Sequence, residues 1–494
     1  KPAFDHEICA GLNRLYFCTF TCSPYEMGLP GQEYFAGTHV NPQVTWWDDS
    51  TPFIDYFHRT QAVVQNGTFV ADILYYYGDH IPNVFPHKHA DPAGVMPGFD
   101  YDVTNEEILL KTNVRNGKLV VPGGIEYEAL VLPDHKTLSF AALKKIDELL
   151  QKGASVVGYR PERFISLTGG DKAQRQFRET ARKIWGDETS KKGEKTYGKG
   201  GVVAWGVPAR EFLTGRGLKP DFAVMNRDWQ TDFDYIHYKV AGKDVYFVSN
   251  QTAERQKTVC SFRLSGFRPE IWEALTGTIR EAKAFRQHDG LTSVPLTFEP
   301  YGAVFVVFNE QIPATAQGTA EQNDPDYRPV MELSGSWTVS FDPARGGPES
   351  VVFPELIDWT KHADEGIKYY SGAAVYRKTF SIDFIPEKDK SYYLQLEEVK
   401  DVGIAAVEIN GKNRGVVWTK PFRIDIGNYL RTGDNTLEIR VVNSWYNRVA
   451  GDELSAGNDR RTSTNIVLTK AFKGVHISLE PSGLIGPVRI MEGI

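Results

Sequence analysis

The sequence predicts a multidomain protein that is α/β in its first part and all-β in its second. Helix-period and strand-like apolar patterns alternate as far as about residue 225. From there to the end, short alternating strand patterns follow one another, separated by turn residues. With 494 residues, of which 41% are apolar, the chain is long enough for several hydrophobic cores.

Composition argues against two classes of partner. The net charge is −7, and no basic run is interleaved with aromatic residues, so we expect no nucleic-acid binding. No apolar run approaches the roughly 18 to 20 residues that a membrane-spanning helix needs, so we expect no membrane partner. The sequence does not indicate the oligomeric state.

The four cysteines, at positions 9, 18, 22 and 260, are too few and too scattered for a disulfide framework. Alternation places Cys18 and Cys22 on one face of a predicted strand. They either form part of a metal site or pack as small hydrophobic side chains, and the frequent burial of free cysteine favours packing.

Residues 1–85 read as two βα units of a barrel-like segment. We expect helices over about 3–12 and 50–67 and strands over 13–21 and 69–78. Between them lies the loop YEMGLPGQEYFAGTHVNPQVTWW, residues 25–47. It follows the C-terminal end of a predicted strand, which is where α/β barrels and open α/β sheets place their binding residues. Its aromatic content predicts an ordered loop.

Residues 86–225 read as a separate α/β domain. The strand YEALVLP, the helix TLSFAALKKIDELLQKG and the strand ASVVGYR follow in order, with Gly153 expected to end the helix. A nucleotide site is not expected, since no GxGxxG motif is present and TGGDK at 168–172 lacks phosphate-loop spacing. The segment more plausibly supports its neighbour.

The second part of the chain reads as two β domains. Residues 226–312 predict an antiparallel β-sandwich, and the polar, proline-containing stretch 313–330 predicts a linker. Residues 331–494 predict a second sandwich of jelly-roll type that folds independently. Within it, INGK at 409–412 predicts a tight hairpin turn, because Asn and Gly tolerate positive φ.

The chemistry expected from the residues is that of a sugar-active protein. Aromatic residues make up 12% of the chain, and such rings stack on the C–H faces of sugars. Glycoside hydrolysis needs two carboxyl groups, and Glu33 is the candidate catalytic residue, placed in the loop between Gly31 and Tyr34. It is either a general acid whose pKa is raised by loss of water or a loop carboxylate bonded to nearby amides.

Several polar and aromatic residues near this loop are candidate substrate-binding groups. His39 and Asn41 suit hydroxyl recognition, Trp46 and Trp47 suit stacking, and packed loop anchors are the alternative for all four. We expect only one of the two tryptophans to face ligand. The remaining candidates are Asn13, Tyr77 and Asp79, while Trp418 is a candidate platform for a second sugar site.

Long stretches of the sequence resemble a known family. GLNRLYFCTFTCSP, GTHVNPQVTWW and YFHRTQAVVQNGTFVADILYYYGD resemble the late barrel segment of glycoside hydrolase family 106, the α-L-rhamnosidases. Downstream, LVLPDHKTLSFAALKKIDELLQKGASVVGYRP and INGKNRGVVWTKPFRIDI resemble that family's accessory domains. The resemblance implies the C-terminal part of a (β/α)8 catalytic barrel, an α/β domain, a β-sandwich and a galactose-binding-like domain, in that order.

The resemblance also implies a function. It implies an exo-acting, inverting, calcium-assisted hydrolase that removes α-L-rhamnosyl residues from plant polysaccharide such as pectin, secreted or periplasmic in a bacterium. The ligands of the metal are not indicated. The paired catalytic glutamates are expected on earlier barrel strands, upstream of Lys1, so this chain is expected to lack part of the catalytic apparatus and to show no turnover alone.

Two other functions remain open from the sequence. One is a different exo-glycosidase with a similar domain layout, such as a β-galactosidase-like enzyme. The other is a carbohydrate-binding protein without catalysis, which the expected absence of the carboxyl pair would explain.

Overall fold

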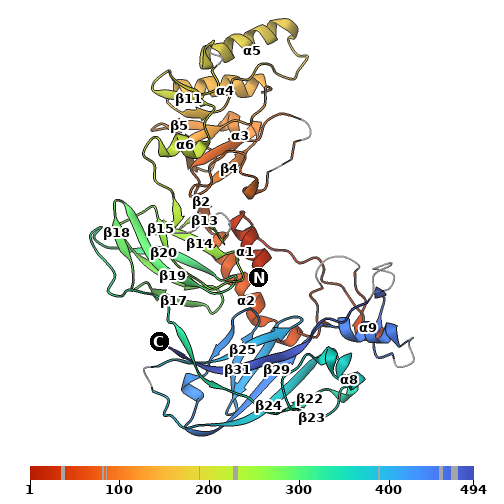
Figure 1. Cartoon of the computed structure of the whole chain (residues 1–494). Helices are drawn as coiled ribbons and strands as arrows, with labels where there is room; N and C mark the ends of the chain where they lie inside the picture. Colours follow the sequence, from red (N-terminus) through yellow and green to blue (C-terminus); the bar gives the residue numbers. More distant parts are fainter. Residues whose placement is uncertain are drawn as a thin grey trace. The chain divides into compact units, whose positions relative to one another are not determined.

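The computed structural model describes residues 1–34, 39–80, 83–84, 86–187, 190–225, 232–387, 390–455, 460–468 and 477–494. The chain divides into two compact units (Figure 1). The first contains Lys1–Asn13 and Ala62–Asn323, and the second contains Arg14–Gln61 and Asp324–Ile494.

The first unit contains an α/β domain built on a six-stranded sheet. Its strand order is β10-β11-β9-β8-β3-β4, parallel throughout except for the β10–β11 pair. The strands are β3 (Ile73–Tyr76), β4 (Tyr101–Thr104), β8 (Ala129–Val131), β9 (Ser155–Val157), β10 (Gly193–Tyr197) and β11 (Gly201–Trp205). A small sheet contains β5 (Asn113–Arg115), β6 (Lys118–Val120) and β7 (Glu126–Tyr127).

Helices of the α/β domain contribute buried apolar residues to the hydrophobic clusters around the sheet. They are α3 (Glu106–Lys111), α4 (Phe140–Gln151), α5 (Gly170–Trp185) and α6 (Ala209–Thr214), and Figure 1 shows α4 beside α5. Helix α4 lies directly against β9 and β11. The helix predicted over 137–153 is confirmed as α4. The Ser139 side chain caps it by accepting a hydrogen bond from Ala142 N, and Gly153 follows its end at a φ of +104°.

Two expectations for residues 1–85 are wrong. The stretch 13–21 forms no strand, and its side chains are half-buried or exposed. The strand predicted over 69–78 forms as β3, but between β4 and β8 of the α/β domain. All four residues of β3 are buried, as expected of a parallel strand covered on both faces. The boundary predicted at residue 85 therefore cuts through one sheet, and no sheet of the described residues closes into a barrel.

The first unit also contains the predicted antiparallel sandwich. One sheet has the order β12-β15-β19-β18, and the other β17-β16-β20-β14-β13-β2. The strands are β2 (Gly67–Phe69), β12 (Phe222–Val224), β13 (Phe233–Val240), β14 (Lys243–Asn250), β15 (Gln256–Phe262), β16 (Phe267–Glu273), β17 (Thr278–Glu281), β18 (Arg286–His288), β19 (Leu291–Phe298) and β20 (Ala303–Gln311). The N-terminal helix α1 (Pro2–Cys9) packs against β13 and β14.

The stretch 313–330 is bound to its neighbours over much of its length. Asn323 Nδ2 donates to the carbonyl oxygens of Ala284 and Pro295, each at 2.8 Å, and Gln317 Nε2 donates to Gln287 O at 3.1 Å. Strand β21 (Tyr327–Glu332) then begins the second unit's sheets. The last passage of the chain from one unit to the other thus lies at residues 323 and 324, within the predicted linker.

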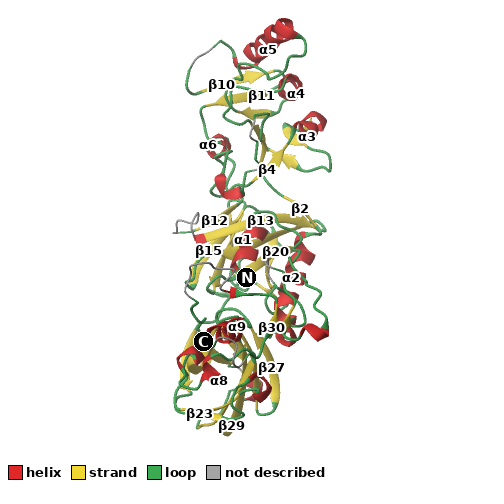
Figure 2. Ribbon diagram, turned by 90° about the vertical axis from the view of Figure 1, so that its right-hand side faces the viewer, coloured by secondary structure: helices red, strands yellow, loops and turns green. Residues whose placement is uncertain are grey.

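The second unit is built on the predicted C-terminal sandwich (Figure 2, strands in yellow). One sheet has the order β21-β31-β25-β28 and the other β23-β22-β24-β29-β26-β27. The remaining elements are β22 (Trp337–Ser340), β23 (Val351–Phe353), β24 (Ala373–Ile382), β25 (Tyr392–Lys400), β26 (Ile404–Ile409), β27 (Lys412–Val417), β28 (Phe422–Asp425), β29 (Gly433–Val442), β31 (Gly483–Gly493), α8 (Glu365–Lys368) and α9 (Tyr446–Leu454). Asn410 and Gly411, at φ of 51° and 72°, form the predicted turn between β26 and β27.

Residues 14–61 belong to this second unit, which the sequence did not predict. Helix α2 (Thr51–Val64) contributes Phe53 and Tyr56, whose rings lie 5.3 and 5.6 Å from that of Trp418. Asp49 forms an ion pair with Arg440 of β29. The compact unit around the C-terminal sandwich is therefore larger than 331–494.

Searched over its described residues, the chain contains no helix with the length and apolar character needed to cross a membrane.

The side chain of Lys88 is buried in the first unit, and four oxygen atoms lie within 3.0 Å of its ammonium nitrogen. Lys88 Nζ donates to the carbonyl oxygens of Cys9 at 3.0 Å and Tyr235 at 2.6 Å. It also lies 3.0 Å from a carboxylate oxygen of each of Asp100 and Asp234. Burial by itself lowers the pKa of Lys88, but the two carboxylates more than offset this and raise it above its usual value. The charged ammonium therefore joins α1, β13 and the segment before β4.

A second buried charge cluster joins the sandwich to the α/β sheet. His237 Nδ1 lies 3.0 Å from Asp221 Oδ2, and Nε2 lies 2.9 Å from Asp244 Oδ1. Burial by itself lowers the pKa of His237, but the two carboxylates raise it to about 8. Arg263 Nη2 lies 3.3 Å from Asp221 and 2.7 Å from Asp72, which directly precedes β3. Asp72 therefore links the start of β3 to the sandwich through Arg263.

Replacing Lys88 is expected to destabilise the first unit strongly. Lys88→Met would leave the Asp100 and Asp234 carboxylates buried without their cation, which typically costs about 3 to 5 kcal/mol. Urea unfolding of the full chain measures the change in free energy. Lys111→Met is the control, because it removes only an exposed ion pair with Glu107, worth about 0 to 1 kcal/mol. Equal losses in the two variants would contradict the assigned role of Lys88.

The pH dependence of stability should report on His237. Its pKa is raised from about 6.5 in the unfolded chain to about 8 in the folded one, so its contribution is complete below pH 6.5 and is lost as pH rises through 8. The difference corresponds to about 2 kcal/mol. His237→Gln should remove this part of the pH slope in urea unfolding, whereas the exposed His288→Gln should keep it. Equal slopes in wild type and His237→Gln would refute the assignment.

Candidate functional site

The loop that begins at residue 25 is anchored to the C-terminal part of its own unit. Strand β1 (Pro30–Gly31) pairs in parallel with β30 (Ser463–Thr464). Just beyond β1, Glu33 N donates to Asn465 Oδ1, and Asn465 Nδ2 donates to Glu33 O, both at 2.8 Å. The backbone of Glu33 is therefore held by a side chain 432 positions later in the chain.

Glycine is required at the turn that leads to Glu33. Gly31 has a φ of +82°, which residues with a side chain rarely adopt. A Cβ at this position would lie 2.2 Å from Ser23 Oγ and 3.0 Å from Gly28 O. The same Ser23 hydroxyl accepts a hydrogen bond from Gln32 N at 2.8 Å. At Gly31 the chain therefore passes close to Ser23 and Gly28, two residues before Glu33.

Glu33 and His39 form the pair at the centre of the candidate site. His39 Nδ1 lies 3.1 Å from Glu33 Oε2, and the Glu33 side chain is only 15% exposed. Burial raises the pKa of the Glu33 carboxyl, whereas positive charge on His39 lowers it. The structure thus places the predicted catalytic carboxyl beside a predicted substrate-binding residue.

The hydrogen bonds of His39 limit where its protons lie. His39 Nε2 is 2.6 Å from the carbonyl oxygen of Tyr34, which only accepts hydrogen bonds, so Nε2 carries a proton and donates it. The contact between Nδ1 and Glu33 then shares one proton. Either imidazolium donates to a carboxylate, or a carboxylic acid donates to neutral imidazole. The pair can therefore hold a proton in a site that is largely withdrawn from solvent.

The other candidates in this loop serve its packing. Asn41 is 1% exposed, and its Oδ1 accepts a hydrogen bond from Gln43 N at 2.9 Å, so in this arrangement it is packed inside the loop. Both tryptophans are half-buried: Trp46 packs edge-on against Phe53, and Trp47 against Phe20. The expected division between one packed and one exposed tryptophan is not seen.

Three of the predicted binding residues belong to the first unit. Asn13 is exposed beside a cavity of about 360 Å3 that Lys88 and Asp100 also line. Tyr77 packs against an apolar cluster of the α/β sheet. Asp79 accepts hydrogen bonds from the Tyr76 hydroxyl at 2.6 Å and from Ser139 N at 2.8 Å.

These contacts give Tyr77 and Asp79 structural roles. Asp79 holds the start of α4, because both of its carboxylate oxygens accept hydrogen bonds from protein donors.

In the second unit, Trp418, the expected stacking platform, is packed against α2. Cys18 and Cys22 are exposed free thiols, so their expected burial as small hydrophobes is wrong.

A group of potential metal ligands that the structure brings together was not found from the sequence. Among the described residues, one group of three potential metal ligands is found, namely His6, His87 and His89. Calcium takes oxygen ligands, so three imidazoles do not fit the calcium that the family resemblance implied. The HxH spacing in PHKHAD was a usable signal, but nothing in the sequence connects it with His6.

Comparison with known proteins agrees with the resemblance. The model of glycoside hydrolase family 106, described as alpha-L-rhamnosidase, matches residues 1–287. The fold resembles that of the rhamnosidase from Novosphingobium sp. PP1Y with a TM-score of 0.87 and 31% identity, over 99% of this chain and 46% of that one. A Formosa agariphila protein named "Putative beta-glucuronidase" is 24% identical over 671 residues, 92% of this chain and 56% of that protein.

The chain thus spans about half the length of the relatives it matches. Because the family model covers more than half of the chain and the fold match extends over nearly all of it, the chain belongs to the α-L-rhamnosidase family, glycoside hydrolase family 106.

Proposed function

We propose that the chain is part of an exo-acting α-L-rhamnosidase that removes terminal α-L-rhamnosyl residues from a plant polysaccharide such as pectin, outside the cytoplasm of a bacterium. The observation that carries this proposal is the Glu33–His39 pair, which lies inside the region matched by the family model. Glycoside hydrolysis by inversion needs one carboxylic acid to protonate the leaving group and one carboxylate to activate water.

In this proposal Glu33 is the general acid and His39 positions it. Burial favours the protonated form of Glu33, which is the form a general acid needs. Asn465 fixes the backbone of Glu33, and the Tyr34 carbonyl fixes the ring of His39. Trp46 and Trp47 are only half-buried by their packing, and in this proposal one of them also contacts the apolar face of the sugar. The same proposal assigns the base to a second carboxyl, contributed by the rest of a longer enzyme that contains this chain.

A second candidate function is favoured by one relative. The Formosa agariphila protein aligned with 92% of this chain is named as a β-glucuronidase, so the sugar at the non-reducing end is a uronic acid in this alternative. A β-galactosidase-like enzyme and a binding protein without catalysis are the remaining alternatives.

The substrate is tested with a panel of aryl glycosides and the longer protein that contains this chain. We expect release of the aglycone from the aryl α-L-rhamnoside and none above background from the β-D-glucuronide or β-D-galactoside. The 494-residue chain alone should release none, because the proposal places one of the two required carboxyls elsewhere. Preference for the glucuronide would replace the proposed substrate, and turnover by the chain alone would show that both carboxyls lie within it.

The role of Glu33 is tested by Glu33→Gln in the longer protein. We expect kcat to fall about a hundredfold or more, because the amide cannot donate the proton. Stability should change little, since the Asn465 hydrogen bonds involve only the backbone of Glu33. Glu26→Gln, at an exposed position of the same loop, is the matched control and should keep wild-type kinetics.

His39→Gln separates positioning from simple packing in the same assay. Loss of positive charge beside Glu33 should raise the pKa of that carboxyl and move the alkaline limb of the kcat/KM profile to higher pH. The exposed His58→Gln should leave the profile unchanged. A His39→Gln enzyme with lower thermal stability but an unshifted profile would assign His39 to packing alone.

A further inference from the structure

Three histidines of the first unit lie together, far from each other in sequence. His6 comes from α1, and His87 and His89 come from the segment around η3 (Lys88–Ala90). Each offers a ring nitrogen, and these nitrogens all lie within 4.8 Å of one another. We propose that His6, His87 and His89 form a binding site for a late first-row divalent cation, Zn2+ being the ion whose preferences the site fits best.

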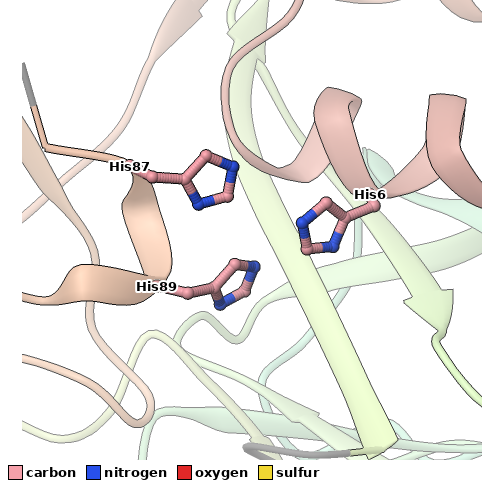
Figure 3. Close-up of side chains that lie close together, drawn as sticks. All are labelled: His6, His87 and His89. Carbon is pink, nitrogen blue, oxygen red and sulfur yellow. The ribbon is translucent and has the colours of Figure 1, made fainter.

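The arrangement of the rings supports a common ligand. The ring of His6 lies 4.8 Å from that of His89 and 5.5 Å from that of His87, centroid to centroid, and His87 and His89 are 5.4 Å apart. Figure 3 shows the three rings converging from the two segments. Two nitrogens bound to one tetrahedral Zn2+ lie about 3.3 Å apart. Small rotations of these rings, which are half-buried or exposed, bring the nitrogens to that separation.

The backbone holds His87 and His89 on one side of their segment. Their neighbour Lys88 is buried and bound to Asp100, Asp234 and two carbonyl oxygens. His87 has extended φ and ψ, and Lys88–Ala90 form a 3-10 turn with three residues per turn, so neither flanking ring shares the inward direction of the Lys88 side chain. One of the carbonyls that hold Lys88 belongs to Cys9, at the end of the helix that carries His6. The buried lysine therefore fixes both halves of the site.

Asp234 supplies the carboxylate that commonly supports a metal-binding histidine. His89 Nε2 lies 3.2 Å from Asp234 Oδ2, which is buried and has no other hydrogen-bond partner among the described residues. A proton on Nε2 directed at this carboxylate leaves Nδ1 of His89 as the ligand atom. The other oxygen of Asp234 is bound by Lys88 Nζ and by Tyr235 N, so the carboxylate is fixed before any metal binds.

The donor set selects the class of cation. Neutral imidazole suits Zn2+, Cu2+ and Ni2+, whereas Ca2+ and Mg2+ require oxygen ligands. Three protein ligands on Zn2+ leave a fourth position for water. A bound ion would link α1 to the segment around η3. It would stabilise the first unit, because it binds the folded chain in preference to the unfolded one.

The test uses the 494-residue chain freed of metal with a chelator and titrated with Zn2+ by calorimetry. We expect one Zn2+ per chain at this site and a melting temperature that rises with Zn2+ concentration. His6→Ala, His87→Ala and His89→Ala should each weaken binding about tenfold or more. Ca2+ should release no heat of binding at this site. Any rise in melting temperature that Ca2+ causes should persist in the three histidine variants.

Two control variants identify the source of any binding. His288→Ala removes an exposed histidine of the same unit, and the double variant Cys18→Ser, Cys22→Ser removes the exposed thiols. Both should bind Zn2+ as the wild type does. Folding of every variant is checked by its melting temperature without metal. Absence of Zn2+ binding in the wild type, unchanged binding in the three histidine variants, or loss of binding only in the cysteine variant would each overturn the proposal.

Discussion

The organisation of the first unit depends on one buried ammonium group. Lys88 is surrounded by two carboxylates and two carbonyl oxygens, contributed by the end of α1, the segment before β4 and strand β13. An isolated charge in such a place would be strongly unfavourable, so these segments are stable only when all of them are assembled. The helix, the α/β sheet and the sandwich therefore form one unit rather than three independent domains.

A second cluster of buried charges joins the sandwich to the α/β sheet. Asp72, Arg263, Asp221 and His237 form this cluster, and Asp72 stands at the entry to β3. Such pairs add little net stability compared with apolar packing, but they are costly to break. The cluster lies where the chain passes from one sheet to the other: β2 pairs with the sandwich, whereas β3, four residues later, pairs with the α/β sheet.

In the second unit, contacts with residues far away in the sequence hold the loop that begins at residue 25. Two residues of parallel pairing, the Asn465 carboxamide and a glycine with positive φ fix the approach to Glu33. Preorganisation of this kind suits catalysis, since a proton donor must be held near its working geometry before substrate arrives. The backbone that carries the proposed acid is thus held by a side chain 432 positions later in the chain.

The sequence by itself determined the elements that depend on neighbouring residues. Ser139 and Gly153 delimit α4, Asn410 and Gly411 form the hairpin turn, and alternating patterns give both sandwiches. Long motifs also identified the family. Tertiary structure alone decided that β3 joins the α/β sheet, that Asn41 is buried, that Glu33 meets Asn465 and that His6 meets His87 and His89. Each of these depends on contacts between residues far apart in the chain, and a local pattern carries no information about which distant partner satisfies a buried polar group.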